Sequence, residues 1–312
     1  MSQNNKGITN LYGHRIFNYL ILCLFGLSVS LSVSAQKDRQ KQGAKVYIDH
    51  ADILRYNQME MPNVQIAKGN VKFRYKDMTL LCDSAYLNEQ QSTFQALGNV
   101  DLKRKDGTRI TCQRAYYDGY LQTLRARERV VVRQPLKSLK CDSLDYNMVS
   151  NVANYFDGRG TLTYGNNVVV ADQGDYNTDT HDANFYGNVV IHTPKYDINT
   201  PTARGNTDTG LMNVLGKSVI RTKRGEVVHT NDGTYNSKTD YMQLNGYSTI
   251  KSPQRDIEGN NIIYNSTTGD AEGHGNVKIN DKVNKRTMMG EDVTYNSKTG
   301  HTEGHGKVKI ID

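Results

Sequence analysis

Residues 228–239, VHTNDGTYNSKT, carry a pattern that returns along most of this chain. Residues 257–268 read IEGNNIIYNSTT and residues 288–299 read MMGEDVTYNSKT, so that a Tyr-Asn pair stands at the same place in each. Weaker copies fill the sequence from Val46 onward at a period of about 29 residues. A fixed period of this size predicts one structural unit stacked eight to nine times, with contacts mainly between neighbours.

Each repeat contains a second landmark, a glycine ten residues after the Asn position. This column holds Gly69, Gly98, Gly187, Gly216, Gly246, Gly275 and Gly306, whereas Glu128 and Asp157 interrupt it. After the glycine, apolar and polar residues alternate, as in Val71-Lys-Phe73. Alternation with period two is typical of a half-buried strand. The recurrent glycine favours a bend in the backbone.

The predicted repeat is therefore two bent strands joined by polar turns such as Asn-Ser-Lys-Thr. Turns of this composition favour hairpins, and so we expect an all-β fold built as an antiparallel meander. The alternative is a parallel β-helix. At about 4.8 Å per strand, the antiparallel form predicts a rod of roughly 80 Å and the parallel form roughly 40 Å. Solution scattering distinguishes the two lengths.

Stacking would align apolar side chains of successive repeats in rows. The predicted inner residues are Val71, Phe73, Val100, Leu102, Val189, Ile191, Val219, Val277 and Ile279. Such rows have two interpretations. They either line an open trough that binds acyl chains, because burying each CH₂ group contributes about 0.8 kcal/mol, or they close on each other as a dry core.

The N-terminal residues have the order of an export signal. Residues 1–15 contain Lys6 and Arg15 and no acid, and an apolar run follows up to Val33-Ser-Ala35. This order predicts a secretory signal peptide over residues 1–35, a linker over 36–45 and a repeat domain over 46–312. The mature chain would then work in an exported compartment. The rival interpretation of the apolar run is a retained membrane anchor.

Positive charge is concentrated in residues 101–140, which hold eleven Lys and Arg. Arg125, Arg127 and Arg129 alternate, and on a regular strand their side chains would share one face. We expect this face to meet an anionic lipid headgroup or an acidic partner, because the planar guanidinium binds pairs of oxygens. The alternative is a solvated basic face. Nucleic acid is a poor partner for an exported protein.

Three cysteines, Cys82, Cys112 and Cys141, occupy one column of consecutive repeats. A small inward-facing core position explains them, since buried cysteine behaves as a small hydrophobe. A disulfide between neighbouring rungs is the alternative.

The sequence contains no catalytic constellation and no cofactor motif. Glu272-Gly-His274 and Glu303-Gly-His305 could in principle hold zinc, but an exposed corner explains them as well, and we predict no metal and no enzyme. Three classes of function remain to be compared. They are a lipid conduit, a structural or adhesive solenoid that binds protein or glycan, and a polysaccharide-acting β-helix enzyme, which would need clustered acids.

The export signal, Ala51-Asp-Ile-Leu-Arg-Tyr56 and the recurrent Gly-Asn-Val resemble the OstA-like proteins. That family comprises the periplasmic bridge of lipopolysaccharide transport and the N-terminal domain of the outer-membrane translocon. The resemblance implies a folded-over antiparallel sheet of the β-jellyroll or β-taco type, open along one side, that holds lipid A acyl chains between two walls. It also implies a location in the periplasm, at or near the outer membrane, and other bridge components of the same fold as partners.

The last strand pattern, Val308-Lys-Ile310, has no proline or helix after it in this sequence. An unpaired strand edge is a template for another chain. We therefore expect Val308 and Ile310 to form a stacking edge, which docks a similar domain or a second copy head to tail.

Overall fold

The computed structural model describes residues 47–311 apart from 57–58, 60 and 76–77. The predicted signal peptide and linker lie outside these described residues. Within them the chain forms strands and turns, without a helix. The strands are β1 (Tyr47–His50), β2 (Ile53–Tyr56), β3 (Val64–Tyr75), β4 (Met78–Asn88), β5 (Thr93–Arg104), β6 (Arg109–Asp118), β7 (Thr123–Gln134), β8 (Lys137–Asn147), β9 (Val152–Phe156), β10 (Gly160–Tyr164), β11 (Asn167–Ala171), β12 (Gln173–Asn177), β13 (Asp182–His192), β14 (Tyr196–Asn206), β15 (Leu211–Thr222), β16 (Val227–Asn236), β17 (Tyr241–Lys251), β18 (Arg255–Asn265), β19 (Ala271–Asp281), β20 (Arg286–Tyr295), β21 (Thr302–His305) and β22 (Lys309–Ile311).

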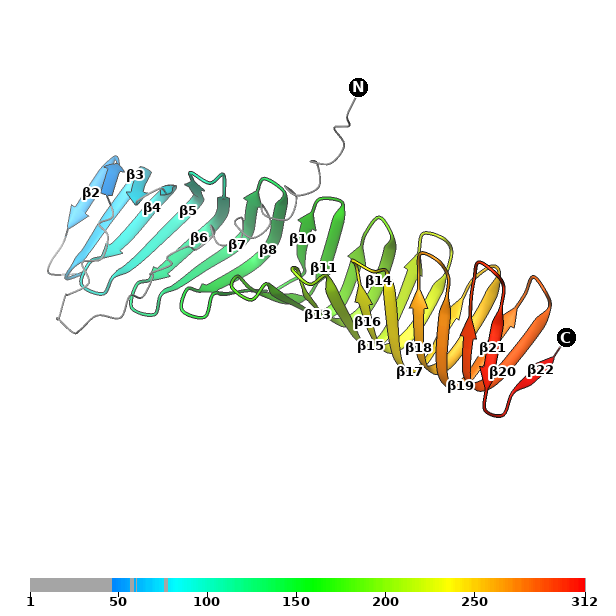
Figure 1. Ribbon diagram of the computed structural model, residues 1–312. Coiled ribbons are helices and arrows are strands. Elements are labelled where there is room, and N and C mark those ends of the chain that lie inside the picture. Colours follow the sequence, from blue (N-terminus) through cyan, green and yellow to red (C-terminus); the bar gives the residue numbers. More distant parts are fainter. Residues whose placement is uncertain (1–46, 57–58, 60, 76–77, 312) are drawn as a thin grey trace, which may run out of the picture. The chain divides into compact units, whose positions relative to one another are not determined.

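The chain divides into two compact units. The first unit consists of the described residues up to Pro135 together with Leu144–Ala153, and the second consists of Leu136–Ser143 and residues 154–311. In each unit, strands that follow one another in sequence pair antiparallel, for example β4 with β5 and β17 with β18 (Figure 1). The predicted antiparallel fold is thus confirmed, and the parallel β-helix is wrong for the described strands.

Each long strand bends once and thereby contributes to two walls. The pairing of β4 with β5 shifts between Leu81 and Ser84, opposite Gly98 and Asn99, whose φ angles are 74° and 45°. The bend divides each long strand into two arms. The arms that are joined by turns such as 105–108, 193–195 and 223–226 form wall A. Wall B consists of the arms that are joined by the turns after each Asn position, such as 89–92, 207–210 and 237–240.

The bend explains why glycine recurs. A Cβ atom on Gly98 would overlap the carboxylate of Asp83, and that carboxylate accepts a hydrogen bond of 2.9 Å from Asn99 Nδ2. Asp52 with Asn70 and Asp172 with Asn188 repeat the arrangement. The two interruptions of the glycine column keep the same bend, because Glu128, Arg129, Asp157 and Gly158 all have positive φ. The interruptions of the sequence pattern are therefore not interruptions of the fold.

The interior of the second unit is a continuous apolar core. One row of side chains on wall A stays in register from strand to strand: Leu139, Leu162, Val169, Ile191, Ile198, Ile220, Val228, Ile250, Ile257, Ile279, Met288 and Ile310. From Ile191 to Met288 every member is buried. Side chains of wall B, including Met242, Leu244 and Ile262, fill the space opposite.

The three cysteines are buried and free. Cys82 lies opposite Val71 and Cys112 opposite Val100. Because β5 separates β4 from β6, Cys82 and Cys112 are not on adjacent strands, and the alternative, a disulfide between neighbouring rungs, is not formed. Burial raises the pKa of Cys82 and Cys112 to about 11 and that of Cys141 to about 12. All three are therefore neutral thiols at physiological pH.

Candidate functional site

The interior of the first unit is narrow next to the bend. Five alanines on wall B face one another in register across β3 to β7: Ala67, Ala85, Ala96, Ala115 and Ala126. All are buried, as are Val71, Val100 and Val130 on wall A. Methyl side chains take little room, so that the two walls pack closely at the bottom of the fold.

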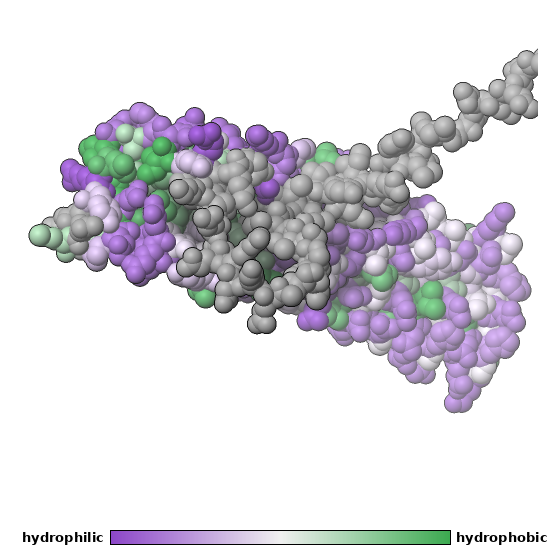
Figure 2. Space-filling view, turned by 60° about the vertical axis from the view of Figure 1, so that its left-hand side comes forward, coloured by the Kyte–Doolittle hydropathy of each residue, from purple (hydrophilic) through white to green (hydrophobic). Residues whose placement is uncertain are grey.

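Several larger apolar side chains nearer to the rims of the first unit remain partly exposed. On wall A these are Leu80 and Leu102, whereas Ile110 and Val132 of the same row are buried, and on wall B they form the row Leu87, Phe94, Tyr117 and Leu124. The walls touch where the rings of Phe73 and Phe94 meet edge to face, with their centroids 4.8 Å apart. Figure 2 shows apolar side chains gathered at the end of this unit where β1 and β2 lie, within a hydrophilic border. The larger side chains between the walls of the first unit are thus partly accessible to solvent.

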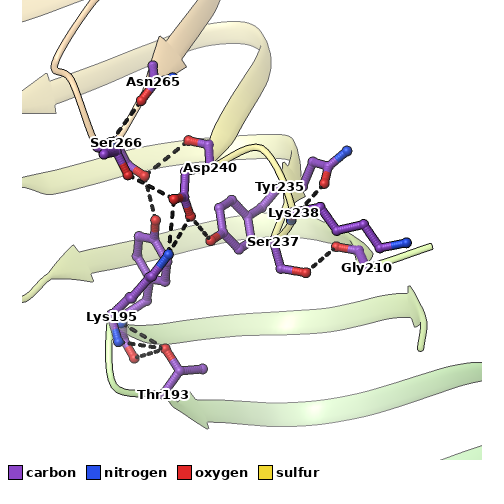
Figure 3. Close-up of polar contacts among 12 residues, drawn as sticks. Thr193, Lys195, Gly210, Tyr235, Ser237, Lys238, Asp240, Asn265 and Ser266 are labelled. Carbon is purple, nitrogen blue, oxygen red and sulfur yellow. Dashed lines mark hydrogen bonds and ion pairs between the residues drawn. The ribbon is translucent and has the colours of Figure 1, made fainter. Parts of the chain in front are cut away.

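In the second unit, side-chain bonds join the two walls near the turns at their rims. Asp240 of wall B accepts hydrogen bonds from Lys195 Nζ of wall A at 2.8 and 3.0 Å and from Tyr235 Oη at 2.8 Å (Figure 3). The hydroxyls of Tyr196 and Ser266 also bond each other across the walls. The rings of Tyr196 and Tyr235 lie 4.8 Å apart.

A second group of contacts continues this closure. Tyr264 of wall B donates a hydrogen bond to Glu226 Oε1 of wall A. The guanidinium of Arg224 donates to the carbonyl oxygen of Ser266 at 3.0 Å and to that of Thr267. We refer to the residues of both groups as the clasp: Lys195, Tyr196, Arg224, Glu226, Tyr235, Asp240, Tyr264 and Ser266. Glu226, Tyr196, Tyr264 and Ser266 are buried, and so the mouth of the second unit is closed here.

The turn of the first unit that corresponds to 222–226 makes different side-chain bonds. The turns at 104–108 and 222–226 have the same backbone hydrogen bonds, Arg104 N to Thr108 O and Thr222 N to Glu226 O. The clasp positions Arg224 and Glu226 correspond to Asp106 and Thr108. Asp106 accepts instead from the backbone of Thr108, within its own turn, at 2.8 Å. At this turn the shorter side chain of Asp106 thus bonds within the turn.

The clasp should respond to acid through Asp240. The hydrogen bond from Lys195 is the largest of the effects that hold the pKa of Asp240 below its ordinary value of 3.8. A lowered pKa means that the stabilisation is complete above the ordinary value and is lost as the pH falls through the lowered one. We expect Asp240→Asn to lower the thermal stability at pH 6, and we expect its difference from wild type to shrink on acidification to about pH 2.5. A difference that is independent of pH in calorimetry would contradict this role.

Eight of the nine predicted groove residues point between the walls. Val71, Phe73, Val100, Val189, Ile191, Val277 and Ile279 are buried, and Leu102 is partly exposed. The assignment of Val219 is wrong. Val219 pairs with Asn199 and His229 on the outer face, whereas Ser218 and Ile220 point inward. The residue two positions after Gly216 is Ser218, and this residue occupies the inner position.

The three predicted arginines do not share one face. Arg125 and Arg127 oppose Tyr116 and Arg114 on β6, but Arg129 lies in the bend with a φ of 55°, which breaks the alternation. The guanidinium of Arg127 bonds Asp145 at 2.5 Å and two backbone oxygens. That of Arg125 lies 5.9 Å from the ring centre of Tyr116. Arg125 and Arg129 are exposed.

A different set of cations is aligned by the fold, and sequence reasoning missed it. Arg74, Lys103, Arg109 and Arg133 lie in one register row on the outer face of wall A, one residue closer to the rim than Leu102. Asp101 bonds Arg109 at 2.7 Å and Lys103 at 3.2 Å. The signal in the sequence was the recurrence of a cation beside the turns of wall A in the first unit, as at Lys103, Arg109 and Arg133.

The acid–histidine pairs lie exposed on wall B. His274 bonds Asp292 at 2.8 Å through Nδ1 and Glu272 at 3.0 Å through Nε2. Its hydrogen bond with Asp292 raises the pKa of His274 above the ordinary value. Both ring nitrogens are occupied by carboxylates, and no group of side chains in the described ranges is arranged to hold a metal ion.

The end strands of the described chain expose apolar side chains. β22 pairs with β20 through Met288 and Ile310, and Val308 and Ile310 are 45% and 52% exposed. At the other end β1 and β2 both pair with β3, and Tyr47, Ile53, Leu54 and Tyr56 are exposed. In the described part of the chain no helix has the length and apolar character needed to cross a membrane.

The fold defines a repeat-built, folded-over antiparallel sheet, and comparison with known families assigns it. A family model of OstA-like proteins matches residues 43–201, just over half of the 312 residues. The chain therefore belongs to the OstA-like proteins. A second model, of the LptA/(LptD N-terminal domain) LPS transport proteins, matches residues 168–270.

One solved structure similar to this chain is LptH from Pseudomonas aeruginosa, described as the LptA homologous periplasmic component of the lipopolysaccharide transport device. It shares 14% sequence identity at a TM-score of 0.24, and the match covers 47% of this chain and 94% of that one. No match was found among curated proteins.

Proposed function

We propose that this protein is a periplasmic lipid-binding conduit, which carries lipopolysaccharide toward the outer membrane with the acyl chains of lipid A between its walls. The observation that carries the proposal is the set of partly exposed apolar side chains inside the first unit, of which Leu80, Leu102 and Phe94 are examples. The families matched by both halves of the chain, which include lipopolysaccharide transport proteins, support the same function.

The physical basis is the transfer of acyl chains from water to an apolar surface. Each buried CH₂ group contributes about 0.8 kcal/mol, so that a few methylene groups per strand suffice for binding. The inner residues of successive strands are similar and lie in register. Neighbouring positions therefore bind a chain with similar free energy, and this favours movement along the row rather than retention at one point.

The polar part of the lipid would lie at the rim. Lipid A is anionic, and the row Arg74, Lys103, Arg109 and Arg133 borders the rim of wall A. Arg125 and Arg129 remain candidates for the same role, or for contact with an acidic partner, on the side of wall B and at the bend. Arg127 is a poorer candidate because Asp145 already binds it.

We further propose that similar domains or further copies stack on the end strands. The exposed Val308 and Ile310 near β22, and Ile53 and Leu54 in β2, provide an apolar surface beside each end strand. Strand addition at such an edge uses backbone hydrogen bonds for affinity, and it would extend both walls into the next domain.

Replacing Ile310 by proline should weaken this association. Proline lacks the N–H group and fits poorly in a ladder, whereas the strands before β20 keep their own neighbours. We expect self-association, measured by sedimentation at increasing concentration, to fall while the circular dichroism spectrum stays unchanged. Lys238→Pro, in a turn of wall B, serves as the control, and equal association of wild type and Ile310→Pro would refute the stacking edge.

Lipid uptake tests the function itself. Delipidated protein should bind labelled lipopolysaccharide, and unlabelled lipopolysaccharide should displace the label. The alternative, an exported structural or adhesive solenoid that binds protein or glycan, predicts no uptake of acyl chains and binding through the outer faces. Neither role requires catalysis or a cofactor.

A further inference from the structure

The two units present their interiors differently. On wall A of the first unit Leu80 and Leu102 are partly exposed, although Ile110 and Val132 of the same row are buried, whereas the corresponding row of the second unit is buried throughout from Ile191 to Met288. The second interior is nevertheless as apolar and as regular, with twelve aligned side chains on wall A. An acyl chain that reached this interior would find an apolar surface there too.

The bonds that close the second mouth are polar and lie at the tips of turns. Lys195 is about half exposed and meets Asp240, and exposed ion pairs of this kind contribute about 1 kcal/mol or less. The hydroxyl pair of Tyr196 and Ser266 and the Tyr264–Glu226 bond add neutral and charge-assisted hydrogen bonds. Such bonds exchange readily for bonds to water when the rims separate.

Glu226 shows that the closed state is not fully satisfied. Its Oε1 accepts the bond from Tyr264, but its Oε2 is buried and has no hydrogen-bond partner among the described residues. A buried carboxylate oxygen without a partner is costly. Separating the rims would return this oxygen to water, and this gain would offset part of the free energy that is lost when the bonds of the clasp break.

The cations of the clasp match the chemistry of an anionic lipid. Lys195 is held by a carboxylate and Arg224 by two backbone carbonyl oxygens. A phosphate group at the mouth could replace these partners, because both cations bind phosphate oxygens well. At the positions of Arg224 and Glu226 the first unit has Asp106 and Thr108. These two residues bond each other within the turn, and neither is a cation that could bind a phosphate group.

We infer that the second unit contains a latched acyl-chain compartment, and that an anionic lipid enters it only when the clasp opens and the lipid phosphate takes Lys195 and Arg224 from their present partners. The inference rests on the proposed function. It adds that the two units differ in access: the first accepts lipid directly, and the second accepts it after its rims separate.

The experiment locks the clasp and records lipid contact in each unit separately. A photoreactive diazirine side chain is placed at Leu102 in the first unit or at Met212 in the second, where Met212 packs against the core beside Tyr235. Lys195→Cys and Asp240→Cys are then joined by a short bismaleimide. The native cysteines are buried thiols with raised pKa values, and so they react slowly. Purified lipopolysaccharide is the probe.

The matched control joins two turns of the same wall. Lys238 donates a hydrogen bond of 2.8 Å to the carbonyl oxygen of Asp208, and both residues belong to wall B. The pair Asp208→Cys and Lys238→Cys, joined by the same reagent, adds a crosslink without connecting the rims. Circular dichroism and thermal melting of each sample establish that the fold is retained.

Locking the clasp should reduce lipid crosslinking from Met212 by about tenfold or more, with crosslinking from Leu102 unchanged, because the closed population rises to nearly all molecules. The control crosslink should change neither signal. The double variant before crosslinking should label Met212 more than wild type does. Equal labelling of Met212 in locked and control proteins would overturn the latch. Absence of labelling from both positions in wild type would instead overturn the proposed function, and the latch with it.

Discussion

Leu102→Asp is expected to abolish the binding of lipopolysaccharide while the protein stays folded. Leu102 lies between the walls of the first unit but is partly exposed, so that a carboxylate there keeps access to water. The charge would nevertheless lie where acyl chains are proposed to bind, and desolvating it on binding would cost several kcal/mol. Affinity, measured with labelled lipopolysaccharide, should fall by about tenfold or more.

An aspartate in the corresponding row of the second unit should mainly reduce the stability of the fold, rather than lipid binding alone. Ile257 is 1% exposed within the apolar core, and Ile257→Asp would bury an unpaired charge and leave a cavity. We expect a loss of about 4 kcal/mol or more of unfolding free energy, which is a large part of the stability of a typical domain. Leu81→Asp, on the outer face of β4, is the control. Parallel loss of stability and binding in Leu102→Asp would contradict an accessible interior in the first unit.

Gly187→Ala is expected to destabilise the protein by about 2–4 kcal/mol. Two effects combine at this position. Gly187 has a φ of 73°, which strains any residue with a Cβ atom, and its Cβ atom would lie 2.5 Å from the carboxylate oxygen of Asp172. Asp172 would have to move away from Asn188, with which it makes a hydrogen bond of 2.8 Å.

Gly246→Ala separates the two effects. Gly246 has a φ of 70°, but a Cβ atom there would meet nothing within 4 Å. This variant should cost only the backbone strain, of order 1–2 kcal/mol. Chemical denaturation of both variants measures the difference. If Gly187→Ala and Gly246→Ala are equally stable, then the contact of the bend with Asp172 has no energetic role.

Much of the fold follows from local patterns in the sequence. The period predicts stacking, the alternation after each glycine predicts which residues of β3 and β5 point inward, and the polar turns predict antiparallel pairing. Val219 shows the limit of such reasoning. An apolar residue was assigned to an inner row by type, although the distance from Gly216 places Ser218 there. Arg129 shows a related limit, because the bend interrupts alternation even where glycine is replaced.

The clasp and the rim row could not be predicted in the same way. Tyr196 and Ser266 lie on different turns and meet only because the sheet folds over. The turn at 223–226 differs from the turn at 105–108 in carrying Arg224 and Glu226, but only the folded structure places these two side chains opposite Ser266 and Tyr264. The cations of the rim row likewise come from four strands, and only the register of those strands aligns Arg74 with Arg133.

The central claim is that the apolar interior of the first unit carries lipopolysaccharide, and photocrosslinking in cells tests it most directly. A photoreactive side chain at Leu102, between the walls, is compared with one at Leu81, which is 37% exposed on the outer face of the same wall. The account predicts a lipopolysaccharide adduct from Leu102 and little or none from Leu81. Adducts of equal yield from both positions, or none from Leu102 in well-expressed and folded protein, would contradict it.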